Sequence, residues 1–190
     1  MDIATLQAQQ TLYVRQRITL MINRYEVRAD AGGSPGALIA FVEQKRMTLK
    51  EQVTFYTDES RSGVLAAFKA RKVLVLGGAY DVTDGAGAAI GLFRKDFTKS
   101  LLRSTWHVEQ PGVGTATGQE RSMAIAMLRR FTDITFLPYH FDFVRDGRTA
   151  FSVEKKWGIR DQYVVSIADQ QLDRRLVIAM AVGLDALQGR

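Results

Sequence analysis

The chain has 190 residues, 46% of them hydrophobic, and a formal net charge of +6, so we expect one domain over residues 1–190 whose partners are polyanions. The absence of Cys excludes disulfides, Cys-bound zinc and thiol nucleophiles. Residues 1–10, which we expect to be the least ordered, lack the basic start and apolar run of a secretory signal, and this predicts a cytoplasmic protein.

Several short segments carry β-branched and aromatic residues at every second position. This period of two is typical of strands, and long helical patterns do not alternate with these segments. We therefore expect a mainly β protein with an antiparallel sheet. The predicted strands are residues 12–21, 25–28, 38–43, 52–57, 64–68 and 73–76.

Three segments repeat one order of residues: aromatic, acidic, apolar, then Asp and Gly at a turn, then an apolar strand that ends in Lys. Each repeat predicts a β-hairpin, because Asp-Gly supplies the positive φ that tight hairpin turns need. Repeated hairpins predict a barrel or a curled sheet. The repeats are residues 25–45 with Asp30 and Gly32, residues 80–95 with Asp84-Gly85, and residues 141–156 with Asp146-Gly147.

Two segments break the strand pattern and predict helices. Thr117 and Glu120 have the spacing of a capping box, and apolar residues then recur at helical spacing, so we expect an external helix over residues 118–130. The second helix is predicted over residues 172–187. Its stretch from Leu176 to Leu184 leaves no polar face, so it must be buried, and it is far shorter than the ~20 apolar residues that span a bilayer.

Candidate catalytic and metal-binding motifs fail on physical grounds. Residues 32–36 match the G-x-S-x-G pattern that would make Ser34 a nucleophile, but Pro35 lacks the N–H that an oxyanion hole needs, and a strand follows where a helix is required. His107 and His140 do not have the spacing of a metal site. We therefore predict a protein that is not an enzyme and that uses no cofactor or metal.

Several further segments carry a family resemblance. They are the hairpin motif Tyr-Glu-Val leading to Lys, residues 121–131, residues 139–143, residues 155–165 with the sequence KKWGIRDQYVV, and Asp173-Arg174-Arg175-Leu176 before the apolar helix. Together they resemble the LURP-one-related and phospholipid scramblase-like proteins, bacterial members included, over most of the chain. Those proteins share the tubby C-terminal-like fold. The resemblance implies a closed antiparallel barrel of about twelve strands, with the helix over residues 172–187 through its centre.

The resemblance also implies contact with lipid. Tubby domains bind phosphoinositide head groups through basic residues, and scramblase-like members are associated with phospholipid bilayers, although the Cys cluster and Pro-rich N-terminus of scramblases are absent here. We expect a non-enzymatic module without a transmembrane segment that docks on anionic phospholipid at a membrane surface, through cations at strand ends. These cations are Lys69, Arg71, Arg94, Lys95, Lys155 and Lys156.

Three alternatives remain open. The first is a protein-interaction or regulatory scaffold that uses the helix over residues 118–130 and exposed barrel edges. Nucleic-acid binding ranks third among all the functions considered, because the sequence shows no platform of interleaved aromatic and basic residues. A hydrolase acting through Ser34 ranks last.

Overall fold

The computed structural model describes residues 3–17, 22–45, 52–71, 78–96, 104–121, 140–156 and 162–188. These residues form twelve strands and two helices. The strands are β1 (Thr11–Arg17), β2 (Asn23–Asp30), β3 (Pro35–Lys45), β4 (Gln52–Tyr56), β5 (Val64–Ala70), β6 (Ala79–Asp84), β7 (Ala89–Lys95), β8 (Thr105–Gln110), β9 (Gly114–Glu120), β10 (His140–Arg145), β11 (Arg148–Lys156) and β12 (Gln162–Ile167), and the helices are α1 (Ile3–Gln7) and α3 (Arg174–Gln188).

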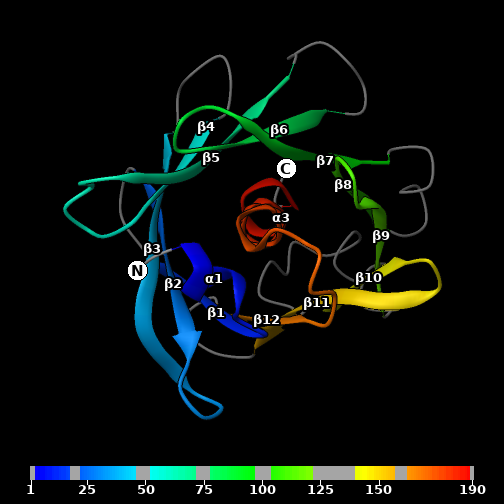
Figure 1. Cartoon of the computed structure of the whole chain (residues 1–190), viewed down its shortest axis with the longest axis horizontal. Helices are drawn as coiled ribbons and strands as arrows, with labels where there is room; N and C mark the ends of the chain where they lie inside the picture. The colour runs from blue at the N-terminus through cyan, green and yellow to red at the C-terminus, as the bar shows by residue number, and fades with distance from the viewer. Residues whose placement is uncertain are drawn as a thin grey trace, which may run out of the picture.

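The twelve strands form one closed antiparallel barrel (Figure 1). Each strand pairs with its neighbours in the chain, and β1 pairs with β12 to close the ring. The predicted closed antiparallel barrel of about twelve strands is therefore confirmed. Five predicted strands overlap β1 to β5, although residues 18–21 of the first lie outside the described residues. The sixth, residues 73–76, also lies outside them. The three predicted hairpins are the pairs β2–β3, β6–β7 and β10–β11.

The hairpin turns use positive φ as expected, with one difference. Asp146 and Gly147 have φ of 52° and 74° between β10 and β11. Between β6 and β7 the residue with positive φ is Gly87, at 88°, and not Gly85. This turn is longer than two residues, because the N–H of Gly87 donates to the carbonyl of Asp84, which shifts the left-handed position along the chain.

The predicted helix over residues 118–130 is wrong at its start, because Thr117 and Glu120 belong to β9. Ala116, Gly118 and Glu120 are buried and alternate with more exposed residues, which is the period of a strand. The strand prevails because β9 pairs with both β8 and β10. Residues 122–130 lie outside the described residues.

Helix α3 is buried along most of its length. Its residues from Leu176 to Val182 are 0% exposed. It contacts β5, β6 and β7 as well as β12, and β6 and β12 stand six places apart in the ring (Figure 1). Asp185 accepts hydrogen bonds from Tyr25 on β2 and Tyr163 on β12, the two strands that flank β1. Within the described residues, no helix is long and apolar enough to cross a membrane.

Aromatic rings lie so close to two glycines that no side chain fits there. The ring of Phe143 stacks on Phe151, with 4.1 Å between centroids, and covers Gly118, where a Cβ would lie 2.3 Å from the ring. On α3, a Cβ on Gly183 would meet the ring of Phe93 at 2.9 Å. Interiors packed to crystal-like density leave such positions to glycine.

The N-terminal segment is tied to the start of α3 by a buried arginine. Arg174 is 0% exposed, and its guanidinium donates to the carbonyls of Gln9 and Leu172, at 3.0 and 2.8 Å, and to the side chain of Gln170. The backbone N–H of Arg174 donates to the side chain of Gln7. This arrangement satisfies a buried charge with carbonyl dipoles.

We expect Gly118→Ala to lower the free energy of unfolding by about 1–3 kcal/mol, because the ring of Phe143 must leave its place. Gly78→Ala is the matched control, since among the described residues a Cβ there would meet only the side chain of Tyr80, at 3.8 Å. Urea unfolding followed by tryptophan fluorescence measures both variants. Equal losses in the two variants would contradict the clash.

We expect Arg174→Met to cost about 3–5 kcal/mol of unfolding free energy, because Met fills similar space but leaves the buried carbonyls without donors. Arg148→Met is the control, since Arg148 is exposed and its side chain makes no hydrogen bond or ion pair with the other described residues. Scanning calorimetry compares the two melting temperatures. A shift no larger than that of the control would show that the carbonyl cage is not needed.

Candidate functional site

The structure separates the six predicted lipid-binding cations. Lys95 and Lys155 pack on rings of the barrel interior: their ammonium groups each lie 5.8 Å from a ring centroid, that of Trp106 and that of Tyr163 respectively. Lys155 is only 7% exposed. Neither side chain is placed on the outer surface, where a bilayer would meet the barrel.

Three of the other cations lie on the outer face of β5, β6 and β7, among carboxylates. Arg71 donates to Asp81 at 2.7 Å, and Arg94 donates to Glu109 at 2.9 Å. Lys69 is exposed, and its side chain makes no hydrogen bond or ion pair with the other described residues. Among the described residues of this face, Lys69 is therefore the one cation that is not paired with a carboxylate.

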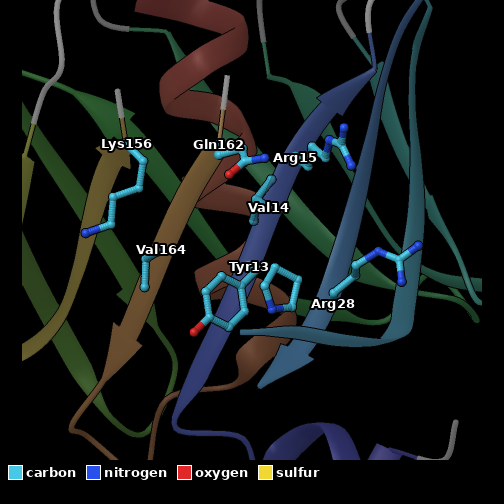
Figure 2. A pocket seen from close by; sticks show the side chains of 8 residues that line it. Tyr13, Val14, Arg15, Arg28, Lys156, Gln162 and Val164 are labelled. Atoms are coloured by element: carbon cyan, nitrogen blue, oxygen red, sulfur yellow. The ribbon is translucent and has the colours of Figure 1, made fainter. Parts of the chain in front are cut away.

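The sixth cation, Lys156, lies at a groove of about 360 Å³ on the outer wall of the barrel (Figure 2). This volume is near the lower end of the ~300–1,000 Å³ that small-ligand sites occupy. The groove crosses β11, β12, β1 and β2 and reaches the first residue of β3. It is lined by Tyr13, Val14, Arg15, Arg28, Pro35, Lys156, Gln162 and Val164.

The strand register places the outward-facing groove residues in two rows. The first row consists of Lys156, Gln162 and Arg15, and the second of Val164, Tyr13 and Arg28. Figure 2 shows Gln162 between the two cations of the first row, and the ring of Tyr13 between Val164 and Arg28. The first row is therefore polar and cationic. The second row begins with Val164 and the ring of Tyr13, which together with Pro35 form what we call the apolar floor. We call this site the outer groove.

The three cations of the outer groove differ in how far they are already bound. Arg28 donates to Glu26 at 2.9 Å, and Lys156 donates to Glu154 at 2.8 Å. The side chain of Arg15 makes no hydrogen bond or ion pair with the other described residues. A guanidinium offers five N–H donors, so Arg15 is the group of this site that is ready to bind an anion.

Glu26 holds Arg28 from the edge of the groove, where the strand register sets Glu26 opposite Arg15 on the outer face of β2. It is 5% exposed and forms ion pairs with both Arg17 and Arg28, while Arg17 also pairs with Glu59 at 2.6 Å. Burial works to raise the pKa of Glu26, but hydrogen bonds from Arg28 and Arg17 outweigh burial and lower that pKa below its ordinary value. Glu26 therefore stays ionised and keeps Arg28 engaged.

The end of the outer groove next to Tyr13 carries a negative charge. The hydroxyl of Tyr13 donates to the carboxylate of Asp30 at 3.0 Å. Desolvation, together with the bond to Asp30 and its charge, raises the pKa of Tyr13, so the phenol stays neutral at physiological pH. An anion in the groove is therefore favoured near Arg15 and disfavoured near Asp30.

The sequence analysis did not predict Arg15 and Arg28 as binding residues, although the alternation of residues in β1 indicates which side chains face outward. Tyr13 and Arg15 alternate with buried residues of β1, which marks them as outward-facing. The missing information was the pairing of β1 with β12, which sets residues 13–15 beside residues 162–164. Such contacts between distant segments follow from closure of the barrel.

Other candidate residues lie apart from the outer groove. The Nε2 atom of His107 lies 3.2 Å from Asp96, and that of His140 lies 3.3 Å from Asp142. Across the described residues, no group of three or more His, Asp or Glu side chains could hold a metal ion. The hydroxyl of Ser34 donates to a carbonyl of its own exposed turn, at 2.9 Å.

We expect Glu26→Gln to lower the free energy of unfolding at neutral pH by about 1.5–3 kcal/mol, because charged hydrogen bonds are lost. Since the folded-state pKa of Glu26 lies below its ordinary value of 4.5, its contribution is present above that pH and is lost as pH falls through the folded pKa. Urea unfolding from pH 6 to pH 3 should therefore show a shallower pH dependence in the variant. Parallel curves for the two proteins would contradict this role.

The comparisons with known proteins give one match. The family model LURP-one-related matches residues 38–185, which run from β3 into α3. Neither the search of curated proteins nor the search of solved structures found a match. The groove residues on β1 and β2 precede the matched region, although their strands complete the same barrel. A match over most of the chain shows that this protein belongs to the LURP-one-related family.

Proposed function

We propose that this domain binds the anionic head group of a phospholipid at a membrane surface, without catalysing a reaction, and that the outer groove is the binding site. The observation that carries the proposal is Arg15, a cation without a partner among the described residues that stands beside an apolar floor. A guanidinium matches phosphate with two parallel N–H bonds.

The mixed lining of the outer groove favours an amphiphile over a small soluble anion. An anion alone would need only the donors of Arg15, Gln162 and Lys156 in the first row. The side chains of Val164, Tyr13 and Pro35 would then remain exposed to water. A lipid can place its phosphate on the first row and the start of its chains on the apolar floor, which removes that apolar surface from water.

The size of the outer groove supports attachment at the bilayer surface. A volume of about 360 Å³ holds a head group but not two complete acyl chains, so the lipid would stay in its leaflet. Each cation near an anionic surface contributes about 1 kcal/mol, and salt screens this attraction. Binding should therefore be weak and salt-sensitive.

A protein-interaction scaffold is the alternative that the sequence left open. That hypothesis used exposed barrel edges, and the closed ring leaves none among the described strands. It also used the helix over residues 118–130, which is β9 at its start and lies outside the described residues from residue 122 onward. The outer groove favours lipid binding over this alternative.

We expect Arg15→Gln to weaken binding to phosphatidylcholine vesicles that contain phosphatidylglycerol about fivefold, the equivalent of one cation near the surface. Arg148→Gln is the matched control: it makes the same change at an exposed arginine without a partner among the described residues, and it should bind almost as the unchanged protein does. Co-sedimentation at two salt concentrations measures both.

Two results would contradict the proposal. If the unchanged protein does not sediment with anionic vesicles even at low salt, the domain does not bind anionic lipid in this way. If Arg148→Gln weakens binding as much as Arg15→Gln, the attraction comes from net charge and not from the outer groove.

A further inference from the structure

We infer that the outer groove selects a head group with a single negative charge, a phosphodiester such as that of phosphatidylglycerol, over a polyphosphorylated inositol head group. This inference rests on the proposed function and narrows it to one class of anionic lipid. It follows from two observations: most cations around the groove already bind a carboxylate, and those carboxylates lie where further phosphates would have to bind.

The outer groove offers one uncommitted positive charge. Arg28 is engaged by Glu26 at 2.9 Å and by the carbonyl of Gly36 at the same distance. Lys156 is engaged by Glu154 at 2.8 Å. Arg15 is the groove cation without a partner among the described residues. One phosphodiester carries one negative charge, so Arg15 can neutralise it without breaking an existing ion pair.

A second phosphate would have to compete for a cation that is already paired. Lys156 and Arg15 stand on β11 and β1 with β12 between them, so their backbones are separated by two strand spacings, roughly 10 Å. A phosphate that reached Lys156 would meet the carboxylate of Glu154 at the same ammonium. Each additional phosphomonoester carries about −1.5 to −2 charges, which makes this repulsion large.

The negative charge of Asp30 repels phosphates from the remaining end of the outer groove. Asp30 lies there, hydrogen-bonded to Tyr13 at 3.0 Å and to the N–H of Gly33 at the same distance. Sites that hold several phosphates use clusters of arginines or lysines. In the outer groove carboxylates lie next to the cations, so each additional phosphate is repelled by a carboxylate as well as attracted by a cation.

The test compares two kinds of phosphatidylcholine vesicles at the same surface charge density, one with phosphatidylglycerol and one with phosphatidylinositol bisphosphate. We expect the protein to bind the phosphatidylglycerol vesicles at least as well, and Arg15→Gln to weaken that binding. A preference of about fivefold or more for the bisphosphate would overturn the inference while leaving the proposed function standing. Binding to neither would overturn the proposed function itself.

A second variant tests the charge count directly. Glu154→Gln removes the carboxylate from Lys156 in a pair whose side chains are 42% and 48% exposed, so the fold should tolerate it. We expect this variant to gain about fivefold more on bisphosphate vesicles than on phosphatidylglycerol vesicles, because it frees a second cation. Equal gains on both would overturn the inference.

Inorganic phosphate separates a lipid site from a site for free anions. At constant ionic strength, replacing chloride by phosphate should leave sedimentation with phosphatidylglycerol vesicles unchanged, because phosphate makes no use of the apolar floor. Release of the protein by phosphate alone would show that the outer groove binds a soluble anion, and would overturn the lipid class inferred here.

Discussion

The pairing of β1 with β12 is the constraint on which the rest of the structure depends. It joins Thr11 to Ser166 and Arg15 to Gln162 across almost the whole length of the chain. Because this pair closes the ring, every strand finds two neighbours and no row of backbone donors is left open among the described strands. The same pair also forms the middle of the outer groove, so the candidate site forms only when the barrel closes.

Helix α3 and the barrel wall each depend on the other. A helical stretch that is apolar on every side, as α3 is from Leu176 to Leu184, is stable in water only when other elements cover every side of it. Helix α3 contacts strands that stand six places apart in the ring. The barrel strands in turn carry glycine where an interior ring leaves no space for a side chain, as at Gly118 beside Phe143. Asp185 of α3 bonds to Tyr25 and Tyr163, so the helix also holds the two strands on either side of β1.

The net charge of +6 describes the surface poorly, because many cations of the described strands are already paired. Arg71, Arg94 and Lys156 each bond to a carboxylate on a neighbouring strand or on their own strand. A candidate anion-binding site is therefore marked by a cation that has no partner among the described residues and that lies beside apolar side chains. By that measure Arg15 stands out more than Lys69, which is equally unpaired but is not among the residues that line the groove.

Local patterns in the sequence predicted β1 to β5, the three hairpins and the buried helix, because period-two alternation, Asp-Gly turns and an all-apolar run are local signals. They did not predict β8, β9 or β12 as strands. It misplaced a helix start at Thr117 and Glu120, where capping residues and alternate strand residues share one spacing and only pairing with β8 and β10 decides. The candidate site depends on contacts between segments that are distant in the chain. Lys155 and Lys156 are neighbours in the chain, yet one packs on Tyr163 and the other lines the outer groove, since successive residues of a strand face opposite sides. Which cation keeps a partner depends on residues brought together from distant segments, and that information appears only once the barrel is closed.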